Sequence, residues 1–261
     1  MTSSPVLTIA HRGASAHAPE NTLAAIRAAI DLRCDLVEVD VQRTRDGVLV
    51  LVHDTDLVRT TDAQRRFRRR SPWLVGDLTY DELLQLDAGS WFSPAYAGER
   101  VPTLDQALDL LAESTTGLLL EVKHPELYPD IAIDVATALR ARPRYVEHAV
   151  SVGRLVVQSF DHQVMRAFAH LEPSIPVGLL GRPPVHQLPL LGTWARFVNP
   201  HHRRADEAYV AAIHAAGMSC LVWTVDREPG MHRALDLGVD GVISNRPDLL
   251  QRTLADRLVP A

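Results

Sequence analysis

The sequence has few cysteines, no surplus of positive charge and no long apolar run. Its 261 residues contain two cysteines, Cys34 and Cys220, which is too few for a disulfide framework and favours two buried thiols in a reducing compartment. Lysine and arginine number 27 against 32 acidic residues, whereas proteins dedicated to duplex nucleic acid usually carry a basic surplus. No stretch reaches the ~18–20 apolar residues of a membrane span.

The amino-terminal segment, Met1 to Leu7, lacks the basic region and apolar core of a secretory signal. We therefore expect a cytoplasmic protein with no integral membrane segment and no nucleic-acid partner. The composition is 46% hydrophobic and 23% charged, which is typical of a globular protein and excludes a disordered or fibrous one.

Short strand-like runs alternate with longer helical patterns along the chain. This order favours a parallel sheet with helical crossovers. Eight strands in about 250 residues fit an α/β fold of the (β/α)8 TIM barrel type, and a doubly wound open sheet is the alternative. The predicted strands are 6–11, 36–42, 118–123, 155–160, 175–180, 196–199, 220–225 and 241–244. The predicted helices are 21–32, 104–112, 130–141, 162–169, 206–216, 228–237 and 248–258.

A hairpin is predicted directly after the second strand. Two strand-like segments, 36–44 and 48–54, flank Asp46-Gly47, which is a strong signal for a two-residue turn. With this turn, Asp40 faces His53 across the hairpin. Directly opposed residues have Cβ atoms about 4.5–5.5 Å apart, so the hairpin brings a histidine back to a carboxylate.

The stretch 55–101 is too long for an ordinary connection between a strand and a helix. We interpret it as a small subdomain, with an apolar cluster of its own, inserted into a single domain that spans 1–261 and overhanging the C-terminal face of the barrel. Its arginine-rich run, 65–70, either contacts an anionic substrate or lipid headgroup or forms a solvated surface.

Three carboxylates occur at predicted strand ends. Glu38 and Asp40 lie two residues apart on one strand and share a face, and Glu121 lies near the end of the next barrel strand. Carboxylates on an inward face are costly without a cation, and hard divalent cations prefer oxygen ligands. The cluster is therefore either a Mg²⁺ or Ca²⁺ site or a charge network closed by Arg12 and Lys123.

Two histidines are expected at the same end of the barrel. His11 ends the first strand, at the face where barrel enzymes carry their active sites, and His53 arrives through the hairpin. Histidines act as general acid and base near neutral pH, and a divalent cation neutralises developing charge. Because Arg12 and Lys123 suit a phosphate, the set indicates phosphoryl transfer. The sequence has neither a P-loop nor a Gly-x-Ser-x-Gly elbow.

Short motifs follow one another in a fixed order over about residues 6–250. They include His11-Arg12-Gly13, Pro19-Glu20-Asn21-Thr22, Glu38-Val39-Asp40-Val41, Thr44-Arg45-Asp46-Gly47, His53-Asp54, Glu121-Val122-Lys123 and Asn245-Arg246-Pro247-Asp248. In this order they resemble the glycerophosphodiester phosphodiesterase family, which adopts a metal-dependent barrel fold. The chain departs from the family pattern at Asn245, where the family often has aspartate, and in the arginine-rich run that lengthens the insertion.

The resemblance implies one divalent cation, Mg²⁺ or Ca²⁺, with Mn²⁺ as a further candidate. Glu38, Asp40 and Glu121 match the metal ligands of the family. His11 and His53 match its acid–base pair, and which of the two is the acid stays open at this stage.

The resemblance also implies contacts to the substrate. Arg12 and Lys123 match the phosphate contacts. Phe160 and Trp223 lie at strand ends where the family shapes the glycerol side of the pocket, and packing at the barrel mouth is the alternative for both. We interpret Asn21 as the capping residue of the first helix.

The implied activity is that of a hydrolase of lipid and glycerol metabolism. It cleaves a glycerophosphodiester to glycerol 3-phosphate and an alcohol such as choline or ethanolamine, with water or the substrate's own glycerol hydroxyl as the attacking group. Two alternatives remain: a lysophospholipase D that acts on a lipid phosphodiester, and a barrel that binds phosphodiesters without cleaving them.

Overall fold

The computed structural model of the chain describes residues 6–258. Most of the amino-terminal segment Met1 to Leu7, for which we predict no secretory signal, lies outside this range, as do the last three residues. None of the helices within residues 6–258 combines the length and apolarity needed to cross a membrane.

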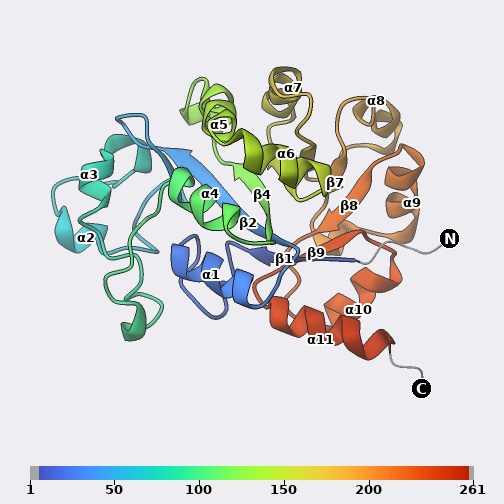
Figure 1. Ribbon diagram of the computed structural model, residues 1–261, viewed down its shortest axis with the longest axis horizontal. Coiled ribbons are helices and arrows are strands. Elements are labelled where there is room, and N and C mark those ends of the chain that lie inside the picture. Colours follow the sequence, from blue (N-terminus) through green and yellow to red (C-terminus); the bar gives the residue numbers. More distant parts are fainter. Residues whose placement is uncertain (1–5, 259–261) are drawn as a thin grey trace.

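Within the described residues, eight parallel strands close into a barrel, as the alternation of elements predicts (Figure 1). The barrel strands are β1 (Leu7–His11), β2 (Leu36–Arg43), β4 (Gly117–Val122), β5 (Leu155–Ser159), β6 (Val177–Leu180), β7 (Phe197–Asn199), β8 (Ser219–Val222) and β9 (Gly241–Ser244). Because β1 pairs with both β2 and β9, the sheet has no free edge between them, which excludes the open doubly wound alternative.

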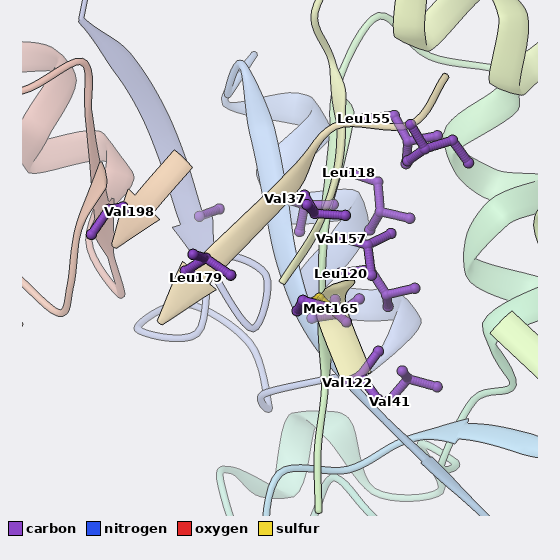
Figure 2. Packing of buried hydrophobic residues seen from close by; sticks show 14 of the residues in the cluster. Val37, Val41, Leu118, Leu120, Val122, Leu155, Val157, Met165, Leu179 and Val198 are labelled. Carbon is purple, nitrogen blue, oxygen red and sulfur yellow. The ribbon is translucent and has the colours of Figure 1, made fainter. Parts of the chain in front are cut away.

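Helices surround the barrel (Figure 1). They are α1 (Leu23–Asp31), α4 (Leu104–Ala112), α5 (Ile131–Arg140), α6 (Pro143–Ser151), α7 (His162–Leu171), α8 (Leu188–Leu191), α9 (Glu207–Ala215), α10 (Glu228–Asp236) and α11 (Pro247–Leu258). The sequence pattern does not predict α6 or α8. The outward side chains of the strands form the main core with these helices, and Figure 2 shows strand residues such as Val37, Leu120 and Val157 packed with Met165 of α7.

The interior of the barrel changes from apolar to polar along the strands. At the end where the strands begin, inward side chains form a small apolar cluster. The cluster comprises Ile9, Leu36, Leu119, Val156, Leu221 and Ile243. Two residues further along β1, β2 and β4 come His11, Glu38 and Glu121. Since side chains on a strand alternate between its faces, the same inward row supplies both the apolar floor and the polar mouth.

The hairpin forms, but its predicted register is wrong by one residue. The short strand β3 (Leu49–Leu51) pairs antiparallel with β2, and Val41 lies opposite Leu51. Asp40 is therefore opposite Val52, whose N–H donates to the Asp40 carbonyl at 3.0 Å, and His53 follows beyond the paired residues. The cause is the turn: it has three residues rather than two, and its last residue, Gly47, has a φ of +89°.

The insertion after the hairpin carries the helices α2 (Ala63–Arg66) and α3 (Tyr80–Leu83) and the short 3₁₀ helices η1 (Val75–Asp77) and η2 (Pro94–Tyr96). In Figure 1 it lies to the left of the barrel. Its buried cluster is mostly aliphatic, and Phe67, Trp73 and Tyr80 pack around it. The buried members are Val50 and Val52 of the hairpin and, from the insertion, Leu57, Ala63, Val75, Leu78, Leu83, Leu86, Ala88 and Val101.

The arginine-rich run of the insertion pairs with acids of the same insertion. Arg65 contacts Asp62 at 2.7 Å, and Arg70 contacts Glu82 at 2.7 Å. Arg65 is 76% exposed, so its charge is well solvated. These contacts favour the solvated-surface interpretation of the run over a dedicated lipid-binding patch.

Candidate active site

Three buried carboxylates meet where β2 and β4 lie side by side. Asp40 is paired in register with Glu121, and Glu38 precedes Asp40 on the same face of β2. One side-chain oxygen from each of the three lies within 4.8 Å of the other two. Burial, together with the neighbouring carboxylates, raises the pKa of Glu38 well above its usual range and that of Glu121 to about 7.

Two cationic side chains partly offset this negative charge. Lys123 Nζ lies 2.8 Å from Glu121 Oε1 and 3.8 Å from Asp40 Oδ1. Arg12 Nε lies 3.2 Å from Asp40 Oδ2. Glu38 accepts the backbone N–H of Arg12 at 2.9 Å, but its Oε1 is buried without a hydrogen-bond partner among the described residues. An unpartnered oxygen beside two further carboxylates fits a divalent cation, which prefers such ligands.

Asn21 supports Asp40, and its predicted role as a helix cap is wrong. The helix α1 is capped by Thr22, whose hydroxyl accepts the N–H of Ala25 at 3.2 Å. Asn21 instead donates from Nδ2 to Asp40 Oδ2 at 2.9 Å and accepts the backbone N–H of Asp40 at 3.1 Å. The amide therefore fixes the orientation of one candidate metal ligand.

His11 is held through one ring nitrogen. Its Nδ1 lies 2.6 Å from Asn245 Oδ1, and the Asn245 amide nitrogen donates to Asp226 Oδ2 at 2.7 Å. Because Asp226 accepts from the amide nitrogen, the amide oxygen faces His11, which assigns the proton to Nδ1 and leaves Nε2 with a lone pair. Burial and the charge of Arg12 lower the pKa of His11 to about 4.

His53 is held by a carboxylate instead. Its Nδ1 lies 2.6 Å from Asp54 Oδ1, and Asp54 Oδ2 accepts from Arg59 Nε at 2.6 Å. Burial lowers the pKa of His53, and the charge of Asp40 opposes this effect. The free nitrogen of His53 is again Nε2.

The predicted site residues gather at one pocket in the barrel mouth. Those that line it are His11, Arg12, Glu38, His53, Glu121, Lys123, Phe160 and Trp223. Asp40, 1% exposed, is buried beside them. Phe160 and Trp223 form the apolar side, with their rings edge to face at 5.6 Å, and Trp223 Nε1 donates to the Asn199 carbonyl at 2.7 Å. Phe160 is 54% exposed, which is unusual for a residue whose only role is packing.

Sequence reasoning missed the residues that hold this pocket in shape. They are Glu20, Asp54, Arg59, Asp226 and Asn245, together with Asn21 in its observed role. Asp54 adjoins a predicted histidine and Glu20 lies in a quoted motif, so both carried a signal. Arg59 and Asp226 carried none: Asp226 bonds to Asn245, which is 19 residues away, and Arg59 reaches Asp54, five residues away, only because the loop between them folds back.

The chain is similar to known proteins in sequence and in fold. A model of the glycerophosphoryl diester phosphodiesterase family matches residues 11–249. The glycerophosphodiester phosphodiesterase of Caldanaerobacter subterraneus subsp. tengcongensis is 34% identical over 252 residues, covering 94% of this chain and 96% of that protein. The enzyme of the same name from Bacillus subtilis is 33% identical, covering 95% and 86%. A solved Oleispira antarctica phosphodiesterase, in complex with the product sn-glycerol-3-phosphate, has a TM-score of 0.82 and 30% identity, covering 95% of this chain and 96% of that one.

Proposed function

The chain belongs to the glycerophosphoryl diester phosphodiesterase family and is a hydrolase of glycerophosphodiesters; we propose that the pocket at its barrel mouth performs this reaction. The observation that carries the proposal is the pairing of two histidines, each held at Nδ1, with a buried carboxylate cluster in one pocket. The product bound to the Oleispira relative, sn-glycerol-3-phosphate, is the product that we expect here.

The carboxylate cluster is our candidate metal centre. Glu38, Asp40 and Glu121 would hold one divalent cation, Mg²⁺ or Ca²⁺, with Mn²⁺ as a further candidate. Such a cation supplies neutralisation of the charge that develops on the phosphoryl oxygens. Arg12 and Lys123, which contact the same cluster, face the pocket and would bind the remaining phosphate oxygens.

The two histidines divide the proton transfers according to their partners. The lone pair on His11 Nε2 takes the proton of the attacking hydroxyl while the oxygen forms its bond to phosphorus. His53, whose charged form is favoured by Asp54, gives a proton from Nε2 to the oxygen of the departing alcohol while the P–O bond breaks. When water attacks, the cycle closes as His11 releases its proton to solvent and His53 takes one up. When the substrate's glycerol hydroxyl attacks, a cyclic phosphate forms, and water then opens it with His53 as the base and His11 as the acid, which restores both histidines.

The test is release of glycerol 3-phosphate from glycerophosphocholine and glycerophosphoethanolamine, with EDTA, Mg²⁺, Ca²⁺ and Mn²⁺ in parallel. We expect metal-dependent release that falls by about 10²–10⁴-fold in His11→Ala and in His53→Ala, the range typical of a general acid or base. His214→Gln is the matched control. His214 also pairs with a carboxylate, that of Asp240 at 2.8 Å, but it lies in the last turn of α9, at the opposite end of the barrel.

Three results would contradict the proposal. Full turnover in folded His11→Ala would show that His11 is not part of the mechanism. Release of choline from lysophosphatidylcholine micelles, with none from glycerophosphocholine, would transfer the activity to the lysophospholipase D alternative. If glycerophosphocholine binds but none of the three metals supports product formation, the result would indicate a barrel that binds phosphodiesters without cleaving them.

A further inference from the structure

A chain of ion pairs crosses the rim of the pocket, outside the groups that touch the substrate. We propose that Arg59, in the insertion, is a positioning residue that holds both His53 and Arg12 in place through Asp54 and Glu20. This inference rests on the proposed function, in which His53 and Arg12 act directly on the phosphodiester.

Arg59 uses all three guanidinium nitrogens in this series of ion pairs. Its Nη1 and Nη2 donate to the two oxygens of Glu20 at 2.7 and 2.8 Å, and its Nε donates to Asp54 Oδ2 at 2.6 Å. A paired contact of this kind fixes direction as well as distance, because the guanidinium fork is planar and rigid. A lysine at this position has one charged nitrogen and cannot reproduce the same geometry.

Each end of this series of ion pairs reaches a proposed catalytic or phosphate-binding group. On one side, Glu20 Oε1 also accepts from Arg12 Nη1 at 2.7 Å, and Arg12 in turn contacts Asp40. On the other side, the second oxygen of Asp54 contacts His53 Nδ1 at 2.6 Å. Arg59 thereby joins the loop after β1, which carries Arg12, to the segment after β3, which carries His53.

The exposure of these side chains indicates that the ion pairs position groups of the site more than they stabilise the fold. Arg59 is 44% exposed and Asp54 31% exposed, so water screens this pair and it contributes little to folding, whereas Glu20, at 12%, is better shielded. Catalysis is more sensitive, since a displacement of about 1 Å can cost on the order of 100-fold in rate. Arg59 is not among the described residues that line the pocket, so it acts through its partners: its effect through His53 is expected in kcat, and its effect through the phosphate contact Arg12 is expected in KM.

The experiment compares Arg59→Gln and Arg59→Lys with Arg65→Gln. Arg65 is a matched control because it also makes an ion pair within the insertion, with Asp62 at 2.7 Å, but has no link to the pocket through the contacts described here. On glycerophosphocholine we expect kcat to fall by about 10–100-fold in Arg59→Gln and by less in Arg59→Lys, with a smaller rise in KM. Arg65→Gln should retain the kcat of the unmodified chain.

A second substrate separates positioning from a general structural defect. A glycerophosphodiester of p-nitrophenol has a leaving group that needs little protonation, so the loss in Arg59→Gln should shrink there, as it should in His53→Ala. An equal loss on both substrates would overturn the positioning of His53, and an unchanged KM would overturn the positioning of Arg12. Full kcat in Arg59→Gln while His53→Ala is inactive would refute this inference and leave the proposed function intact. Full kcat in His53→Ala would instead refute the proposed function.

Discussion

The two histidines of the pocket are held by different chemistry. On one side of the barrel mouth a neutral amide accepts from the ring, and on the other side a carboxylate does. The first set joins the ends of β1 and β9, whereas the second belongs to the hairpin and the insertion. We call them the amide arm, His11–Asn245–Asp226, and the ionic arm, His53–Asp54–Arg59.

In the proposed mechanism, this difference separates the base from the acid. An amide orients an imidazole without stabilising its charged form, so His11 keeps the lone pair that a base needs. A carboxylate at the same distance opposes the lowering of the His53 pKa by burial, so His53, with its charged partner, is the proposed acid. What lies behind each ring, on the side away from the substrate, therefore differentiates the two roles.

The largest effect should come from removing a carboxylate of the candidate metal centre. We expect Glu38→Gln to lose metal-stimulated turnover by at least about 100-fold, since a cation contributes several kcal/mol to such a transition state. Glu126→Gln, at an exposed acid near the same strand end, is the control. Calorimetric titration with Mn²⁺ should show that the variant also loses the metal.

The same substitution should stabilise the metal-free protein. The pKa of Glu38 is raised in the folded state, so its ionised form destabilises the fold above the usual carboxyl pKa, and this penalty disappears as the pH falls. In EDTA at pH 8, Glu38→Gln should therefore melt at a higher temperature than the unmodified chain, and the difference should narrow toward pH 4. A lower Tm at pH 8 would contradict the assignment of Glu38 as an uncompensated charge.

Converting the ionic arm into an amide arm should give the next largest effect. Asp54→Asn keeps a hydrogen-bond acceptor for His53 but removes the charge that favours its protonated form. We expect kcat on glycerophosphocholine to fall on the order of 10-fold or more, with a smaller loss on the p-nitrophenol diester. An equal loss of kcat on both substrates, relative to the unmodified chain, would show that His53 does not act as the acid.

The reverse conversion should change the pH profile more than the maximal rate. Asn245→Asp places a charge beside His11, whose pKa is lowered to about 4, and that charge would raise the pKa. The acidic limb of kcat/KM should then move upward by about one pH unit, which is about tenfold in activity on that limb. An unmoved acidic limb would mean that His11 is not the base that limits activity at low pH.

The smallest effect should come from salt. Raising NaCl from about 0.1 to 0.5 M shortens the screening length and weakens exposed ion pairs more than buried contacts. At saturating substrate we expect kcat to fall by less than about threefold, through the exposed pairs of Arg59. Arg59→Gln should show no such dependence, and an unchanged salt response in this variant would place the sensitivity elsewhere.

Sequence reasoning recovers the barrel well because its signals are local. Runs such as 118–122 and 155–159 are apolar and β-branched or leucine-rich, and each is separated from the next by a helical pattern. Two helices escape this reasoning for local reasons as well. The helix α6 begins at Pro143, directly after another helix, so the two patterns have no clear boundary, and α8 lies in a proline-rich stretch.

The candidate site is predictable as a set of residues but not as a set of contacts. Glu38, Asp40 and Glu121 follow from strand periodicity, because alternation fixes their shared face. The support of His11 by Asn245 joins positions 234 residues apart, and the support of Asp54 by Arg59 depends on how a loop folds back. No periodicity encodes such contacts, which arise only once the fold has brought the segments together.

The three-residue turn of the hairpin has a consequence for engineering of this chain. Loop lengths on a barrel are usually treated as free variables, but the segment from Thr44 to Val48 works as a spacer of fixed length. One residue more or less would shift His53 along the hairpin by about 3.3 Å and turn its side chain to the other face. When this hairpin is exchanged between related barrels, keeping the number of turn residues should therefore matter more than keeping the amino acids that form the turn.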